Sequence, residues 1–178
     1  MAKLDSDIVI VTNDMDVFSL RKFREEFPQR FIDVGVAEQN LINVASGLAS
    51  TGKKVIVFGL LSFLTTRCYE QIKLNICGMK LPVVIVGIGP GLSFSYDGPT
   101  HHSISDIGSF RLIPNLQILN PSGTRTAKKS AQKALDFDRP TLVRLDKGTF
   151  RQPFDDRNIE DGLVEHIPGK QNLIIYTG

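Results

Sequence analysis

A carboxylate and an imidazole stand out as groups that could do acid–base chemistry in this chain. Glu38 lies in DVGVAEQN, residues 33–40, where an apolar run of strand character gives way to a helical pattern. His101 lies in DGPTHH, residues 97–102, inside a stretch rich in Gly, Pro and Ser. A carboxylate removed from water can share a proton with a ligand, and an imidazole titrates near neutral pH. Each is therefore a candidate general acid or base.

Glu38 also has a purely structural explanation. If the helix begins near Val36, Glu38 lies in its first turn, where the helix dipole favours an acid by ~0.3–1 kcal/mol. The helical period places Glu38 on the same face as Leu41 and Ala45, so we expect an acid at a buried edge. The residues alone leave open whether this acid stabilises the helix or contacts a ligand.

The elements that must position these groups form an alternating pattern. Predicted strands cover residues 7–14, 30–35, 53–59, 81–89, 115–121 and 140–145, and predicted helices cover residues 17–27, 37–50, 62–77 and 124–135. Such alternation predicts an α/β fold with a doubly wound, mostly parallel sheet and helices on both faces. The loop 89–106 follows the most apolar strand, and ligands bind at the carboxyl ends of strands in such sheets. Its length also favours a functional role, although a solvated side chain is the ordinary explanation for a histidine in a Ser-rich loop.

Composition sets the limits of the interpretation. The chain has 178 residues, 42% of them hydrophobic and 22% charged, with a net charge of +2, which predicts one globular domain and no nucleic-acid surface. The apolar segments are shorter than the ~20 residues that cross a bilayer, so we expect no membrane insertion. Cys68 and Cys77 have neither zinc-knuckle nor redox spacing. We expect buried thiols, no metal site in this chain and a cytoplasmic location.

Three stretches carry a family resemblance: GVAEQNLINVASGLASTGKKVIVFG, SFLTTRCYEQIK and DGPTHHSISDIGSFRLIPNLQILNPS. Together they resemble the pyrimidine-binding domain of the transketolase family of thiamine diphosphate enzymes, which includes 1-deoxyxylulose-5-phosphate synthase. The resemblance runs from about Asp7 to Gly148 in preserved order. It implies a pyrimidine-binding α/β domain over residues 1–148, and residues 149–178 are then a linker and the first strand of a truncated carboxyl-terminal domain.

The resemblance also implies roles for single residues. The acid of the family's G-x-x-E-Q motif, here Glu38, hydrogen-bonds a ring nitrogen of the aminopyrimidine and favours the tautomer that takes the proton from the thiazolium carbon. Phe63 matches the aromatic that stacks on the aminopyrimidine, although core packing would explain an isolated Phe. Asp14, in VTND, matches an acid near the cofactor. Asp97 and His101 match contacts to substrate hydroxyls or to the carbonyl under attack.

Two positions depart from the family pattern and concern the substrate. His102 stands where a Gln usually follows the first histidine, and Lys147 stands where the family has a phosphate-binding arginine. Lysine binds a phosphate as a point charge without the bidentate fork of arginine. We keep both residues as substrate-binding candidates and leave open whether the substrate is phosphorylated.

An absent motif implies a partner. The family holds magnesium and the cofactor's diphosphate with a GDG motif, which does not occur in this sequence. The resemblance therefore implies a transketolase-like transferase of two-carbon units that acts on a sugar, as a homodimer, only with a diphosphate-binding subunit. Two alternatives stay open: the beta subunit of a 2-oxoacid dehydrogenase, and a non-catalytic assembly module. The DGPTHH loop favours the first of the three.

Overall fold

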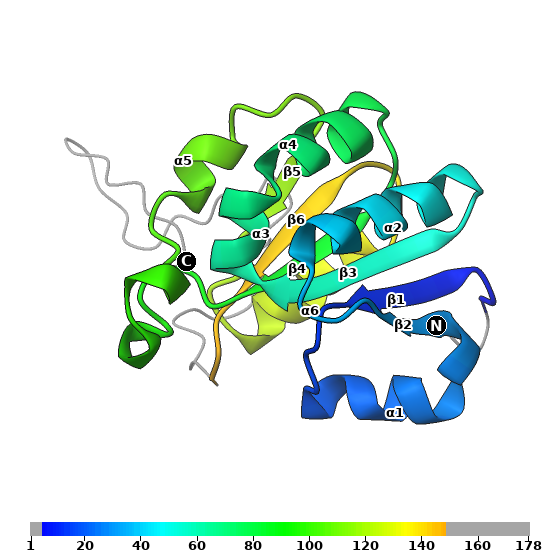
Figure 1. The fold of residues 1–178 in the computed structure, drawn as a ribbon, viewed down its shortest axis with the longest axis horizontal. Helices are drawn as coiled ribbons and strands as arrows, with labels where there is room; N and C mark the ends of the chain where they lie inside the picture. Colours follow the sequence, from blue (N-terminus) through cyan, green and yellow to red (C-terminus); the bar gives the residue numbers. More distant parts are fainter. Residues whose placement is uncertain (1–4, 149–178) are drawn as a thin grey trace.

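The computed structural model describes residues 5–148, which form a six-stranded sheet with helices on both faces (Figure 1). The strand order is β2-β1-β3-β4-β6-β5, and every neighbouring pair is parallel. The strands are β1 Ile8–Thr12, β2 Phe31–Asp33, β3 Lys54–Leu60, β4 Val84–Ile88, β5 Gln117–Leu119 and β6 Thr141–Leu145. All six predicted strands form, and the predicted α/β class is confirmed. The predicted linker and extra strand at 149–178 lie outside the described residues.

The helices divide between the two faces of the sheet. They are α1 Phe18–Glu26, α2 Glu38–Ser50, α3 Leu61–Arg67, α4 Tyr69–Gln71, α5 Asp106–Phe110 and α6 Thr124–Ala134. Helices α2, α3 and α4 lie over one face in Figure 1, and α6 lies behind the sheet. No helix within residues 5–148 has both the length and the apolar character needed to cross a membrane.

The two faces carry cores of different size. The larger core packs Leu41, Ile42 and Ala45 of α2 against β-branched strand residues such as Val57. This is the helix face that the sequence predicts. The smaller core, under α6, joins Ala134 to strand residues of β4 and β6. The better-buried face is therefore the one that carries α2 and Glu38.

The prediction of one helix over 62–77 is wrong. Helix α3 ends at Arg67, the short α4 follows, and Ile72–Gly78 forms a π-helical segment. In α3, the hydroxyls of Thr65 and Thr66 donate to carbonyls four residues back, and such bonds bend helices. A wider π turn adds a residue per turn, and in this arrangement Ile72 and Ile76 remain fully buried.

Candidate functional site at the carboxyl edge of the sheet

The candidate site lies where the strand order changes direction. Strand β1 pairs with β2 on one side and with β3 on the other, so the chain leaves β1 outward and returns past it. A crevice at such a switch point is the usual ligand site of an open α/β sheet. Glu38 is the first residue of α2, which follows β2, and only 3% of it is exposed. The prediction of an acid at a buried edge is confirmed.

Both carboxylate oxygens of Glu38 accept hydrogen bonds. Oε1 accepts from Asn13 Nδ2 at 3.0 Å, and Oε2 accepts from Arg67 Nη1 at 2.8 Å. The guanidinium of Arg67 lies over the Phe63 ring, with Cζ 4.2 Å from the ring centroid. Gln39 Nε2 donates to the backbone carbonyl of Arg67 at 3.0 Å. The start of α2 and the end of α3 are thus joined around the acid.

Asn13 is a site residue that the sequence analysis missed. It follows β1 directly, is 6% exposed, and its Oδ1 atom has no hydrogen-bond partner among the described residues. Gly59 leaves the room for it, because a Cβ there would lie 2.9 Å from that Oδ1 atom. Alternation along the strand places Asn13 on the face of Val11, a signal that could have identified it.

Asp14 occupies a different position from its neighbour. Its side chain is exposed and its backbone has a φ of 57°. Its N–H donates to Asp33 Oδ1 at 2.7 Å, and Gly35 N–H donates to the same oxygen at 3.0 Å. This contact ties the end of β1 to the end of β2. Among the described residues, the backbone of Asp14 shapes the crevice while Asn13 contacts the buried acid.

An aromatic contact links Phe63 to the loop histidine. The Phe63 and His101 rings lie 5.0 Å apart in an edge-on arrangement, and Phe94 lies 6.4 Å from His101 on another side. Thr100 Oγ1 is 3.0 Å from His101 Nδ1. Lys147 Nζ lies 4.3 Å from the Phe94 ring centroid. Three predicted residues, Phe63, His101 and Lys147, are therefore parts of one chain of contacts that begins at Glu38.

The two remaining predicted residues flank this cluster. Asp97 ends a short turn, Ser95–Asp97, and is exposed. His102 is half-buried, and its Nε2 atom is buried with no partner within residues 5–148. Both residues lie on the loop that brings His101 to Phe63, so both border the same surface.

A buried ion pair fixes the far end of this loop. Arg144 on β6 donates from Nε to Asp106 Oδ2 at 2.5 Å and from Nη2 to Oδ1 at 3.3 Å. Its Nη1 donates to Asn120 Oδ1 at 2.6 Å. The near end is held by Gly89 N–H, which donates to the Leu145 carbonyl at 2.9 Å. Both ends of the loop are thus attached to β6, a link that the sequence analysis did not predict.

The two cysteines are buried and unpaired, as predicted. Burial, reinforced by the Glu38 charge and opposed by Arg67, raises the pKa of the Cys68 thiol to about 12. Burial raises the pKa of Cys77 to about 11. Neither thiol is a nucleophile at neutral pH.

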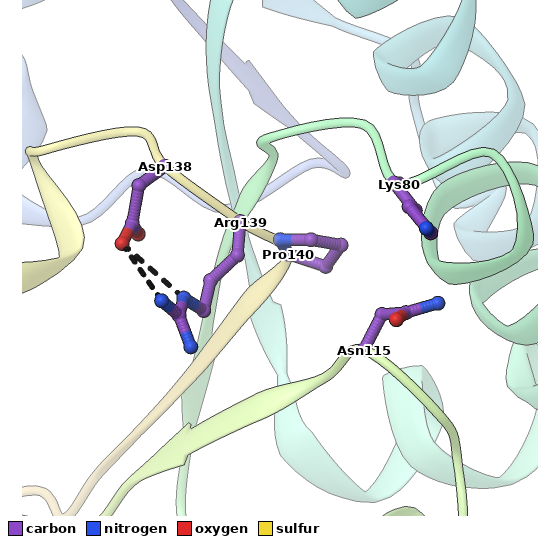
Figure 2. Close-up of a pocket in the computed structure, with 5 residues that line it drawn as sticks. All are labelled: Lys80, Asn115, Asp138, Arg139 and Pro140. Atoms are coloured by element: carbon purple, nitrogen blue, oxygen red, sulfur yellow. Dashed lines mark hydrogen bonds and ion pairs between the residues drawn. The ribbon is translucent and has the colours of Figure 1, made fainter.

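A hollow at the opposite edge of the sheet does not contain the candidate chemistry. Figure 2 shows its lining: Lys80, Asn115, Asp138, Arg139 and Pro140. Pro140 precedes β6, so this hollow is at the amino ends of the strands. Arg139 pairs there with its neighbour Asp138 at 3.1 Å. None of the predicted site residues lines it.

Comparisons with known proteins agree with the site. The family model described as "Transketolase, pyrimidine binding domain" matches residues 1–153. One of the two subunits of an apulose-4-phosphate transketolase of Phocaeicola vulgatus is 32% identical over 176 residues, covering 98% of this chain and 55% of that protein. A 1-deoxy-D-xylulose-5-phosphate synthase of Lachnoclostridium phytofermentans is 35% identical over 98% of this chain and 27% of its own length.

A solved structure described as "Split gene transketolase, inactive beta4 tetramer" matches with a TM-score of 0.77 and 29% identity. The match covers 91% of this chain and 53% of that one. The chain thus spans about half the length of the subunit-type relatives. Together with the family match over most of its residues, these comparisons show that the chain belongs to the transketolase pyrimidine-binding-domain family.

Proposed function

We propose that this chain is the pyrimidine-binding subunit of a transketolase-like enzyme that moves a two-carbon ketol or acyl unit to an aldehyde of a sugar type. The observation that carries the proposal is the buried Glu38 carboxylate at the switch point, in one chain of contacts with Phe63 and His101. The relatives named as transketolase subunits and synthases support the same reaction class.

The residues of this crevice fit thiamine diphosphate. A carboxylate in a low dielectric gives a strong hydrogen bond to a ring nitrogen, and a neighbouring aromatic ring offers a stacking surface. The unpaired, buried Asn13 Oδ1 beside Glu38 is the kind of unsatisfied group that occurs at functional sites. Glu38 and Phe63 would hold the aminopyrimidine, and Asp14 would lie at the rim of its site. When bound, the cofactor supplies the nucleophilic carbon for making and breaking a carbon–carbon bond beside a carbonyl.

The chain's own residues then divide the remaining work. Glu38 holds a proton at the aminopyrimidine nitrogen, and Asn13 keeps the carboxylate in position through its 3.0 Å hydrogen bond. His101 gives or takes a proton at a substrate oxygen. Asp97 and His102 bind substrate hydroxyls, and Lys147, whose charge lies over the Phe94 ring, attracts a phosphate if the substrate carries one.

The proposed enzyme needs a second chain. We propose that a diphosphate-binding subunit supplies the magnesium site, because within residues 5–148 no group of three or more His, Cys, Asp or Glu could hold a metal ion. The description of one relative as an inactive beta4 tetramer supports a requirement for such a partner. A homodimer of this chain within the assembly and a cytoplasmic location stay predictions.

The test is reconstitution with a diphosphate-domain subunit. Binding of thiamine diphosphate with Mg²⁺ is measured by calorimetry, on this chain alone and in the mixture, and ketol transfer is assayed in parallel. We expect binding only in the mixture, and loss of turnover by ~10²–10⁴-fold in Glu38→Gln, as for removal of a general acid–base group. Glu70→Gln, at an exposed position on α4, is the matched control and should keep both. Absence of binding both to the chain alone and to the mixture would instead make the chain a non-catalytic module with the same fold.

A further inference from the structure

We propose that the Arg67 guanidinium occupies the space between Glu38 and Phe63 that the aminopyrimidine of the cofactor requires, so that cofactor binding displaces Arg67. This inference rests on the proposed function and adds a competing residue to it. Its basis is that Arg67 makes both of the contacts expected of the aminopyrimidine. It donates to Glu38 Oε2 at 2.8 Å, and it lies over Phe63 with Cζ 4.2 Å from the ring centroid.

The two planar groups compete for the same partners. A guanidinium is a flat, delocalised group with N–H donors in its plane, and it stacks on aromatic faces. A ring held by a hydrogen bond to Glu38 and by stacking on Phe63 needs that same face. The Phe63 ring also has His101 at 5.0 Å in an edge-on contact, so part of its surroundings is already taken. The guanidinium and the aminopyrimidine therefore cannot share the space.

Arg67 is placed so that its side chain can leave. It is the last residue of α3, and its side chain is 47% exposed, in contrast to the 3% of Glu38. One nitrogen, Nη1, carries the hydrogen bond to the acid. Its backbone is held independently, by the bond from Gln39 Nε2. The exchange therefore requires rotation of one side chain into solvent and no rearrangement of α2 or α3.

The direction of the effect on affinity follows from the pairing of Glu38. Removal of the guanidinium leaves a buried carboxylate with Asn13 as its remaining donor, and an unsatisfied buried acceptor gains most from a new donor. The cofactor would also no longer have to break an ion pair. Arg67→Gln should therefore tighten binding, whereas loss of a residue that supports the cofactor would weaken it.

The experiment measures the Kd of thiamine diphosphate with Mg²⁺, and of thiamine alone, for the complex of this chain with its diphosphate-binding subunit. We expect Arg67→Gln to bind both about three- to tenfold more tightly, the range of a partly exposed ion pair. Arg67→Lys keeps the charge without the planar group and should lie between Arg67→Gln and the unchanged protein. Arg139→Gln is the matched control, because Arg139 is similarly exposed (55%), pairs with Asp138 and lies at the opposite edge (Figure 2). It should leave both Kd values unchanged.

A second readout follows Arg67 directly. In the complex labelled with nitrogen-15 arginine, the Arg67 side-chain signals should shift and narrow when thiamine diphosphate is added, because the guanidinium gains freedom. Weaker or unchanged binding in Arg67→Gln with native thermal stability, or Arg67 signals that stay fixed on titration, would overturn the inference. Loss of binding in Glu38→Gln separates the two proposals. If Glu38→Gln binds like the unchanged complex, the proposed function fails and takes this inference with it. If Glu38 is required and Arg67→Gln weakens binding, only the displacement of Arg67 is refuted.

Discussion

Two buried acids of this chain each pair with an arginine, and the pairs differ in what surrounds them. Asp106 and Arg144 are both buried, with side chains 2% and 9% exposed, and their contact is bidentate. Glu38 is as deeply buried, but the side chain of its partner Arg67 is 47% exposed and donates through one nitrogen. The first pair joins elements of the fold, and the second closes the crevice at the switch point.

The difference shows which contact can change during function. Every nitrogen of the Arg144 guanidinium donates to Asp106 or Asn120, so its removal would leave several buried groups unpaired. Arg67 needs only to turn toward water, which solvates it well. A buried acid with a partly exposed partner is therefore suited to exchange one donor for another, and a fully enclosed pair is suited to hold a loop.

The largest expected effect is on folding stability. Arg144→Met should lower the free energy of unfolding by ~3–5 kcal/mol, because it leaves the Asp106 charge buried without a partner. Arg67→Met should lower it by about 1 kcal/mol or less, since one partner of that pair is half in solvent. Urea denaturation of both variants measures the contrast.

The double variant Asp106→Asn with Arg144→Met provides the control. It removes the buried charge together with its partner and should recover part of the stability lost in Arg144→Met. Equal destabilisation by Arg144→Met and Arg67→Met would contradict the distinction between a fixed and an exchangeable pair.

The next effect concerns the loop that joins the two regions. Gly89 has a φ of 86°, and a Cβ there would lie 2.1 Å from the Phe94 ring. Gly91 has a φ of 60° with open space around its Cβ position, which makes it a matched control for backbone strain alone. We expect Gly91→Ala to cost ~1–2 kcal/mol of stability, the penalty of a left-handed backbone with a Cβ. Gly89→Ala should cost more, because the ring must also move.

Displacement of Phe94 should also change the site. The ring lies beside His101 and under Lys147, so Gly89→Ala should raise the KM for the sugar substrate in the reconstituted enzyme, while Gly91→Ala should not. Urea denaturation and steady-state kinetics on the two variants separate strain from the clash. Identical results for both variants would show that Phe94 does not position the substrate cluster.

The sequence predicts the sheet and the outline of the site because both depend on local patterns. Alternating β-branched runs and helical periods indicate all six strands, and the family motifs identify Glu38, Phe63 and His101. The pairs between elements escape this approach. Asp106 and Arg144 are 38 residues apart, and their contact depends on the crossover that brings α5 to β6.

Arg67 and the broken helix show two different reasons for a miss. Arg67 follows Phe63 by four residues, so helical spacing could have placed it beside that ring. The π-helical segment was missed because the apolar positions of residues 62–77 fit an ordinary helix closely. Tertiary packing of Cys68, Ile72 and Ile76 against the core decides the extra residue per turn, and periodicity does not report it.

The smallest expected effect uses Cys68 as a sensor of the exchangeable pair. Burial raises the pKa of both thiols, but the Glu38 charge raises that of Cys68 further, to about 12 against about 11 for Cys77. The unfolded chain releases these protons near the ordinary value of 9.0. The folded state therefore binds more protons above that pH, and the free energy of unfolding should fall by up to about 1.4 kcal/mol per pH unit and thiol as pH rises from 9.

Neutralisation of Glu38 should narrow the gap between the thiols. In Glu38→Gln the burial of Cys68 remains and the neighbouring negative charge is gone, so its thiolate should appear at lower pH, nearer to that of Cys77. Thiolate absorbance during an alkaline titration measures this in a Cys77→Ala background, and Asp138→Asn, a surface acid at the opposite edge, serves as the control (Figure 2). An unchanged Cys68 titration in Glu38→Gln would mean that Arg67 already neutralises the field of the acid at the thiol. The pair would then be held as tightly as Asp106 and Arg144, and the contrast between the two pairs would be lost.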